Sequence, residues 1–137
     1  MDLGLSGKTV IVTGASKGIG LAVARAFVAE GARVGLVARG AEALDAAQAA
    51  LRSLGGEVAV VAADLRAADQ AEQAVAFIEA RLGPVDVLVN SAGAARKRAP
   101  ETLDAAAWRE GLDAKFFTYI HTCLLYTSPS PRDRQKS

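Results

Sequence analysis

The stretch TGASKGIG, residues Thr13–Gly20, is the part of this sequence that says most about the fold. A short β-branched run ends at Gly14, and an apolar segment with helical spacing follows from Gly18, so the stretch predicts a turn from a strand into a helix. Its glycines have the spacing G-x-x-x-G-x-G, which lets the backbone and the helix approach a phosphate group without an intervening Cβ. The stretch therefore predicts a phosphate-binding turn, the alternative being a glycine turn that binds no ligand.

Strand and helix patterns alternate along the rest of the chain. Short apolar runs predict strands over Lys8–Gly14, Ala32–Ala38, Glu57–Asp64 and Val85–Asn90. Helical spacing predicts helices over Gly18–Gly31, Ala41–Gly56 and Asp69–Leu82, and a fourth helix after the N-cap Asp104. Alternating strands and helices imply right-handed crossovers and a parallel sheet. The sequence thus predicts an α/β fold with a doubly wound, Rossmann-like parallel sheet that is incomplete after its fourth helix.

Each predicted helix has one apolar face that should pack on the sheet. The expected inward residues are Ile19, Val23, Ala26 and Phe27 on the first helix, Leu44, Ala47, Leu51 and Leu54 on the second, Ala71, Ala74, Val75, Ile78 and Leu82 on the third, and Trp108, Leu112, Phe116 and Ile120 on the fourth. We expect Trp108 and Phe116 to be packing residues.

Composition excludes several classes of function. The chain has 137 residues, 51% of them hydrophobic, and a formal charge of +1, so we expect neither a disordered chain nor a nucleic-acid-binding surface. No signal peptide or membrane-spanning run is evident, and no metal site is expected. The single cysteine, Cys123, excludes an internal disulfide and fits a cytoplasmic location.

Three segments together resemble the short-chain dehydrogenase/reductase family over about Leu5 to Thr122. TGASKGIG resembles the glycine-rich segment of the family, and ADL (Ala63–Leu65) resembles its adenine-contacting segment. NSAG (Asn90–Gly93) resembles its Asn-Asn-Ala-Gly segment, with Ser91 replacing the second asparagine. The resemblance implies hydride transfer between a nicotinamide cofactor and a carbonyl or alcohol substrate, in a homo-oligomer. The residues expected to bind the cofactor are Gly14, Ser16, Lys17, Gly18, Ile19, Gly20, Arg39, Asp64, Leu65, Asn90, Ala92 and Gly93.

The end of the second strand sets the choice between NAD and NADP. A carboxylate there would bind the ribose 2′-hydroxyl of NAD, but this chain has Ala38 followed by Arg39. Arg39 can form charge-assisted bonds with the 2′-phosphate of NADP, and Lys17 can approach the same group. In the family, basic residues at these two places imply NADP, so NADP is favoured over NAD. The alternative is that both are ordinary solvated charges.

The family's catalytic Tyr-x-x-x-Lys motif is absent from this sequence. Four residues after Tyr119 comes Cys123, and four after Tyr126 comes Ser130, so no catalytic residue is assigned. Ser91 follows the fourth strand rather than the fifth and is not the family's catalytic serine. A non-catalytic nucleotide-binding protein of the same fold is therefore the alternative function.

Two basic features depart from the family pattern or lie outside it. Lys115 stands where the family often has an asparagine that helps to hold a proton-relay water, and it reads either as a tolerated variation or as a sign of an atypical active site. Arg96–Arg98 follows the fourth strand, and a solvated loop is favoured there over an anionic-substrate contact.

The C-terminal segment does not continue the α/β pattern. CLLYTSPSPRD (Cys123–Asp133) can be encoded by DNA that resembles the transposon end and adapter used to prepare sequencing libraries. The alternative is a genuine disordered tail, because Pro, Ser and Arg suit one. We therefore expect an NADP-binding Rossmann-like region over residues 1–122 and a disordered, non-native tail over residues 123–137. The parent protein, meaning the natural polypeptide that contains this chain, would be a longer enzyme.

Overall fold

A computed structural model describes residues 2–93 and 99–127 of the chain. The elements follow the order β1 (Thr9–Thr13), α1 (Gly18–Ala29), β2 (Arg33–Ala38), α2 (Ala41–Arg52), β3 (Val58–Ala62), α3 (Ala68–Leu82) and β4 (Val87–Val89). A 3-10 turn η1 (Pro100–Thr102), the helix α4 (Ala105–Gly111), a π-helical turn η2 (Leu112–Phe117) and the helix α5 (Thr118–Thr127) complete the described part. The predicted alternation of strands and helices is confirmed.

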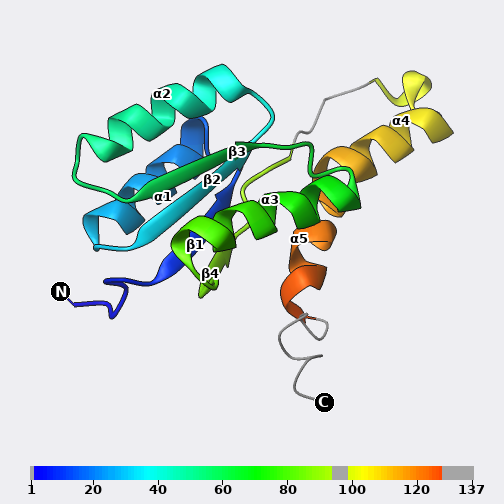
Figure 1. Cartoon of the computed structure of the whole chain (residues 1–137). Coiled ribbons are helices and arrows are strands. Elements are labelled where there is room, and N and C mark those ends of the chain that lie inside the picture. The colour runs from blue at the N-terminus through cyan, green and yellow to red at the C-terminus, as the bar shows by residue number, and fades with distance from the viewer. Residues whose placement is uncertain (1, 94–98, 128–137) are drawn as a thin grey trace, which may run out of the picture.

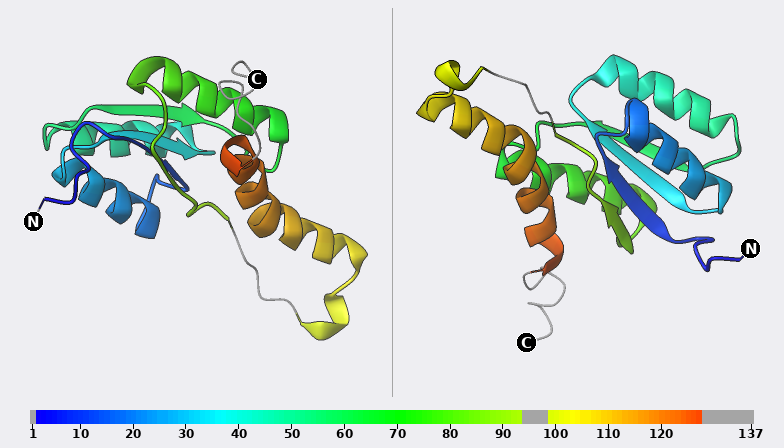
Figure 2. Two further views of the ribbon diagram at one scale, coloured as in Figure 1. Left: turned by 90° about the horizontal axis from the view of Figure 1, so that it is seen from below. Right: turned by 180° about the vertical axis from the view of Figure 1, so that it is seen from behind.

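The four strands form one parallel sheet in the order β3-β2-β1-β4. Successive side chains of β1 point to opposite faces, so Val10 and Val12 pack with α1 and α2, and Ile11 packs with α3. Figures 1 and 2 show α1 and α2 on one face of the sheet and α3 on the other. Both faces are covered, which confirms the doubly wound Rossmann-like architecture and explains why the strands are apolar nearly throughout.

The predicted inward faces of α2 and α3 are largely confirmed. Leu44, Ala47 and Leu51 of α2 are buried, but Leu54 is 58% exposed because α2 ends at Arg52. The buried residues of α3 are the five that the sequence predicts, Ala71, Ala74, Val75, Ile78 and Leu82.

The predicted face of α1 is confirmed only in part, because Val23 and Phe27 are half-buried and pack against the core but Ile19 and Ala26 do not. Its buried residues are Gly20, Ala24 and Val28, whereas Ile19 is 79% exposed and Ala26 is also exposed. The reason is steric, since a Cβ on Gly20 would overlap the carbonyl oxygen of Gly14. The helix therefore packs most closely at a glycine, a residue that a search for apolar spacing does not count.

The fourth helix is longer and less regular than expected. Asp104 is its N-cap, as predicted, with Oδ1 accepting from the backbone N–H of Ala107 at 2.8 Å. The π turn η2 then changes the helical register. After this turn, Thr118 and Thr122 of α5 face inward. On the predicted inward face, Trp108 is 63%, Leu112 46% and Phe116 53% exposed. The expectation that Trp108 and Phe116 pack in a core is therefore wrong for this chain.

The helix α5 crosses the boundary predicted at residue 122. It continues to Thr127, so residues 123–127 are helical where disorder was expected, and Leu125 and Tyr126 pack against the face that α3 covers. In Figure 1, α5 lies next to α3. Residues 128–137 lie outside the described residues. Within the described ranges, no helix is both long enough and apolar enough to cross a membrane.

Candidate functional site

The carboxyl ends of the four strands bring most of the predicted site residues to one edge of the sheet. Because the strands are parallel and ordered β3-β2-β1-β4, the residues that follow them lie in the spatial order Asp64, Arg39, Gly14 and Asn90. In open α/β sheets this edge is where ligands bind, at the point where the strand order reverses. Here the order reverses between β1 and β4, beside Gly14.

The turn from β1 to α1 has the shape that a phosphate-binding turn needs. Gly14 and Gly18 have φ values of +65° and +61°, which residues with a side chain rarely adopt. A Cβ on Gly14 would lie 2.7 Å from the Cα of Ala92, so no side chain fits there. A Cβ on Gly18 would meet no atom within 4 Å, so the space beside this glycine is open.

The first turn of α1 is available to an anion. Lys17 is the N-cap residue, with extended backbone, and its side chain caps no N–H group of the first turn. Unpaired N–H groups and the positive end of the helix dipole attract anions at such a terminus. Lys17, Gly18 and Ile19 are exposed and Ser16 is half-buried, which leaves this turn accessible to a ligand from solvent. The residues present therefore fit a pyrophosphate.

The side chain of Thr13 joins the end of β1 to the segment that follows β4. Its Oγ1 accepts hydrogen bonds from the backbone N–H groups of Ser91 and Ala92, both at 3.1 Å. The same hydroxyl lies 3.4 Å from the carbonyl oxygen of Val89, to which it donates. Thr13 is completely buried, so these bonds hold Ser91 and Ala92 against the glycine turn.

Asn90 is anchored to α5 through its side chain. The hydroxyl of Thr122 donates to Asn90 Oδ1 at 2.7 Å, and Asn90 Nδ2 donates to the sulfur of Cys123 at 3.1 Å. The Asn90 amide is thus engaged within the protein, on the side of the edge toward α5. Ala92 is half-buried and Gly93 is exposed, with φ +135° at Gly93.

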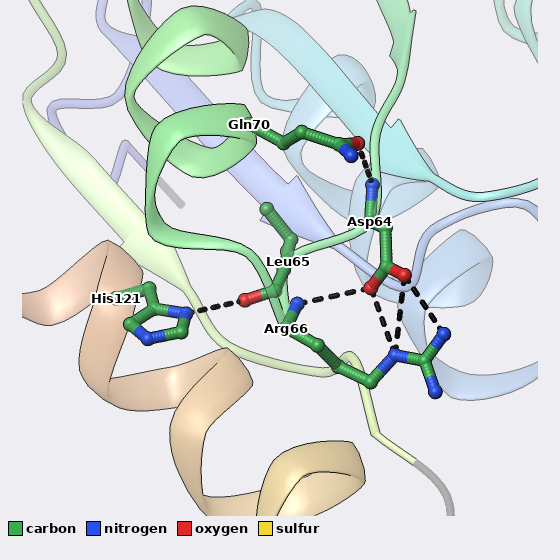
Figure 3. A network of polar contacts seen from close by, with 5 residues as sticks. All are labelled: Asp64, Leu65, Arg66, Gln70 and His121. Carbon is green, nitrogen blue, oxygen red and sulfur yellow. Dashed lines mark hydrogen bonds and ion pairs between the residues drawn. The ribbon is translucent and has the colours of Figure 1, made fainter.

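A polar network holds the segment that follows β3 (Figure 3). Asp64 accepts from Arg66 Nε at 3.0 Å and from Arg66 Nη2 at 2.8 Å, and Asp64 Oδ1 also accepts from the Arg66 backbone N–H at 3.0 Å. The Asp64 backbone N–H donates to Gln70 Oε1 at 2.8 Å, and His121 Nδ1 of α5 lies 2.7 Å from the carbonyl oxygen of Leu65. Neighbours on three sides therefore fix Asp64 and Leu65.

The Asp64 carboxylate is strongly biased toward its ionised form. The hydrogen bonds from the Arg66 side chain lower the pKa of Asp64 from 3.8 to about 2, and the positive charge of Arg39 has a smaller effect in the same direction. Asp64 is thus an anionic hydrogen-bond acceptor at every physiological pH.

The remaining basic residues of interest lie at or near the same edge. Arg39 is exposed directly after β2. Lys115 lies in η2, and a Cβ on Gly93 would come 2.8 Å from Lys115 Cδ, so this lysine sits beside the segment after β4. Its Nζ lies 5.3 Å from the ring centre of Tyr119. Arg96–Arg98 lies outside the described residues.

Several residues of this edge are not predicted by the sequence. These residues position the segments described above, but no sequence motif identifies them: Thr13, Arg66, Gln70, His121 and Thr122. The position of Thr13 could have indicated its role, because a hydroxyl directly before the glycine that ends the strand can reach the neighbouring strand. The described part of the chain contains no group of three or more His, Cys, Asp or Glu residues that could hold a metal ion.

Sequence comparison identifies relatives with named activities. The sequence model of the family described as short chain dehydrogenase matches residues 8–131. Gluconate 5-dehydrogenase of Gluconobacter oxydans is 38% identical over 117 residues, which cover 82% of this chain and 46% of that protein.

Solved structures give the same result. L-Sorbose reductase from Gluconobacter frateurii, complexed with NADPH and L-sorbose, superposes with a TM-score of 0.84 at 32% identity, over 90% of this chain and 47% of that chain. The F189W actinorhodin polyketide ketoreductase with NADPH gives a TM-score of 0.83 at 35% identity, over 92% of this chain and 49% of that one. The chain thus spans about half the length of these relatives. With its glycine turn, its sheet order and a family match over nearly its whole length, the chain belongs to the short-chain dehydrogenase family of oxidoreductases.

Proposed function

We propose that this chain binds NADP(H) and forms the cofactor-binding part of an oxidoreductase acting on a carbonyl or alcohol substrate. The observation that carries the proposal is the convergence of the open glycine turn, Arg39 and Asp64 at one edge of the sheet. The NADPH complexes of L-sorbose reductase and of the actinorhodin ketoreductase support it, since both share this fold at more than 30% identity.

The glycine turn would hold the pyrophosphate. The uncapped N–H groups at the start of α1 would donate to its oxygens, and the open space beside Gly18 would admit them. Ser16, Ile19 and Gly20 line the same turn. On the other side of Gly14, Thr13 would hold Ala92, and with it the adjoining Gly93, beside the cofactor. Asn90 would be positioned by the hydrogen bond that it accepts from Thr122 of α5.

The adenosine end would lie across the ends of β2 and β3. The ionised carboxylate of Asp64 would accept from the adenine amino group, next to the backbone of Leu65. Arg39 would bind the 2′-phosphate by charge-assisted hydrogen bonds, aided by Lys17, because no acidic residue follows β2 directly. This arrangement favours NADP over NAD.

The bound cofactor would supply hydride exchange with a carbon that bears oxygen. The residues of this chain bind and orient it, and none of them is proposed to hold the proton that accompanies the hydride. We propose that this proton donor belongs to the parent protein, meaning the natural polypeptide that contains this chain, and that residues 123–137 are not native to it. The exposed Trp108 and Phe116 support a parent in which another helix or a second subunit covers the arm formed by α4 and η2.

Recovering the natural coding sequence downstream of residue 122 and assaying its product tests the proposal. The parent should contain a Tyr-x-x-x-Lys motif and should oxidise NADPH with at least one carbonyl substrate of a broad panel. The alternative, a non-catalytic nucleotide-binding protein of the same fold, predicts NADPH binding without the motif and without turnover. A parent that binds no nicotinamide cofactor would contradict both.

A further inference from the structure

Asp64, which follows the neighbouring strand β3, is an acidic residue close enough to Arg39 to interact with it. Strands β2 and β3 pair with Ala38 opposite Ala62, and the Ala63 backbone N–H donates to the carbonyl of Ala38 at 2.9 Å. Arg39 and Asp64 therefore follow the ends of two adjacent strands, at the same edge of the sheet. The positive charge of Arg39 contributes to the low pKa of Asp64, so the two groups interact electrostatically. Without a competitor, the carboxylate would attract the Arg39 guanidinium.

Arg66 is that competitor. Its guanidinium makes a two-pronged contact with both carboxylate oxygens of Asp64, the most favourable geometry for an arginine–carboxylate pair. Arg66 and Asp64 form an ion pair at 2.8 Å, and within the described residues no ion pair joins a carboxylate to Arg39. Asp113 and Glu110, on the arm formed by α4 and η2, also act on Arg66 and favour its charged form.

We infer that Arg66 determines cofactor specificity by positioning: it pairs with Asp64 and thereby leaves Arg39 free for the 2′-phosphate. This inference rests on the proposed binding of NADP(H). An Asp64 carboxylate without Arg66 would neutralise part of the Arg39 charge and would repel a phosphate dianion bound beside it. The adenine contact requires only that Asp64 be ionised, which holds for NADH and NADPH alike. Arg66 therefore affects the difference in binding affinity between NADPH and NADH.

The parent protein and four variants, Arg66→Ala, Arg66→Lys, Asp64→Asn and the Arg66→Ala/Asp64→Asn double variant, test this by fluorescence titration with NADPH and with NADH. Arg66→Ala should weaken NADPH binding about twofold to fivefold more than NADH binding, the range expected for an exposed charge pair. Arg66→Lys keeps the charge but loses the two-pronged contact, so it should give a smaller loss. Arg52→Ala is the matched control, because it removes the same charge beside Val58, at the opposite end of β3. The control should leave the NADPH-to-NADH ratio unchanged.

The double variant separates positioning from direct contact. With Asn at position 64 there is no carboxylate to neutralise Arg39, so adding Arg66→Ala should cause no further selective loss of NADPH. A selective loss that persists in the Asp64→Asn background would show that Arg66 touches the phosphate itself and would overturn the inference. An unchanged NADPH-to-NADH ratio in Arg66→Ala, in a parent that prefers NADPH, would overturn the inference alone. A parent that binds both cofactors equally would overturn the proposed cofactor preference and the inference together. Melting curves check that each variant is folded. If Arg66→Ala does not fold, the NADPH-to-NADH ratio of Arg66→Lys tests the inference in its place.

Discussion

The backbone N–H of Ala92 donates to the buried hydroxyl of Thr13 at 3.1 Å, which fixes the segment after β4 against the glycine turn after β1. The Ser91 N–H uses the same oxygen. Thr13→Val keeps the shape but leaves two N–H groups without an acceptor, each costing about 1–3 kcal/mol if it stays buried. We expect a lower free energy of unfolding and weaker cofactor binding in the parent, measured by denaturant titration and fluorescence. Thr13→Ser keeps the hydroxyl and should retain most of both, and equal losses in the two variants would contradict the role of this oxygen.

Gly18 provides a prediction that separates backbone strain from ligand binding. Gly18 and Gly55 both have positive φ, +61° and +87°, and a Cβ on either would meet no atom within 4 Å. Alanine at either position should therefore cost a similar strain energy of about 1–2 kcal/mol. Only Gly18→Ala should also weaken NADPH binding, because its Cβ would enter the space proposed for the pyrophosphate. Equal NADPH affinities in the two alanine variants would remove the pyrophosphate from this turn.

The pair of Asp64 and Arg66 makes a pH-dependent contribution to stability. The pKa of Asp64 is lowered from 3.8 to about 2 in the folded protein, mainly by hydrogen bonds from Arg66. A lowered carboxyl pKa stabilises the fold above the unfolded value, and this stabilisation is lost as the pH falls from about 4 toward 2. Carboxyl carbon shifts recorded by NMR against pH should show a low Asp64 pKa that rises toward 3.8 in Arg66→Ala. An unchanged Asp64 pKa in that variant would show that Arg66 is not its main cause.

The arm formed by α4 and η2 should make the 137-residue chain self-associate. Trp108, Leu112 and Phe116 are exposed at helical spacing and form an apolar stripe. We predict that residues 1–137 alone elute as large species in gel filtration, give no cooperative melt and show no NADPH oxidation with a panel of carbonyl substrates. Trp108→Glu/Phe116→Glu should reduce the association, whereas Leu54→Glu, which changes an isolated exposed apolar residue, should not. A monomeric wild-type chain with a cooperative melt would refute the prediction of self-association. Turnover above background would refute the proposal that the proton donor lies in a part of the parent outside this chain.

The sequence predicts the sheet well because its signals are local. Continuous apolar runs mark buried parallel strands, and the glycine turn marks where the first strand meets its helix. The inward face of α3 follows from apolar spacing alone. The face of α1 follows only in part: Val23 and Phe27 pack on the core as predicted, but the closest contact is made by Gly20, which apolar spacing does not count. The exposed Ile19 has the same explanation.

The contacts at the candidate site depend on packing that spacing does not encode. No pattern indicates the π turn η2, which turns Thr118 and Thr122 inward in place of Phe116. The pairing of Arg66 with Asp64 joins residues two apart in a loop, where neither helical nor strand periodicity applies. His121 reaches Leu65 across 56 positions of the chain, a contact that only the fold creates. Sequence motifs therefore locate the residues proposed to touch the cofactor, and the structure is needed to find those that hold them.

Competitive titration of the parent protein and of Arg39→Ala with NADPH and NADH tests the proposed preference for NADP. Losing a charge-assisted hydrogen bond costs about 1.5–3 kcal/mol, which corresponds to a loss of roughly 10- to 100-fold in NADPH affinity. We predict that the parent binds NADPH more tightly than NADH and that Arg39→Ala removes this preference while NADH affinity stays nearly constant. NADH binding as tight as NADPH binding in the parent would contradict the preference for NADP, and an unchanged NADPH affinity in Arg39→Ala would contradict the binding of the 2′-phosphate by Arg39.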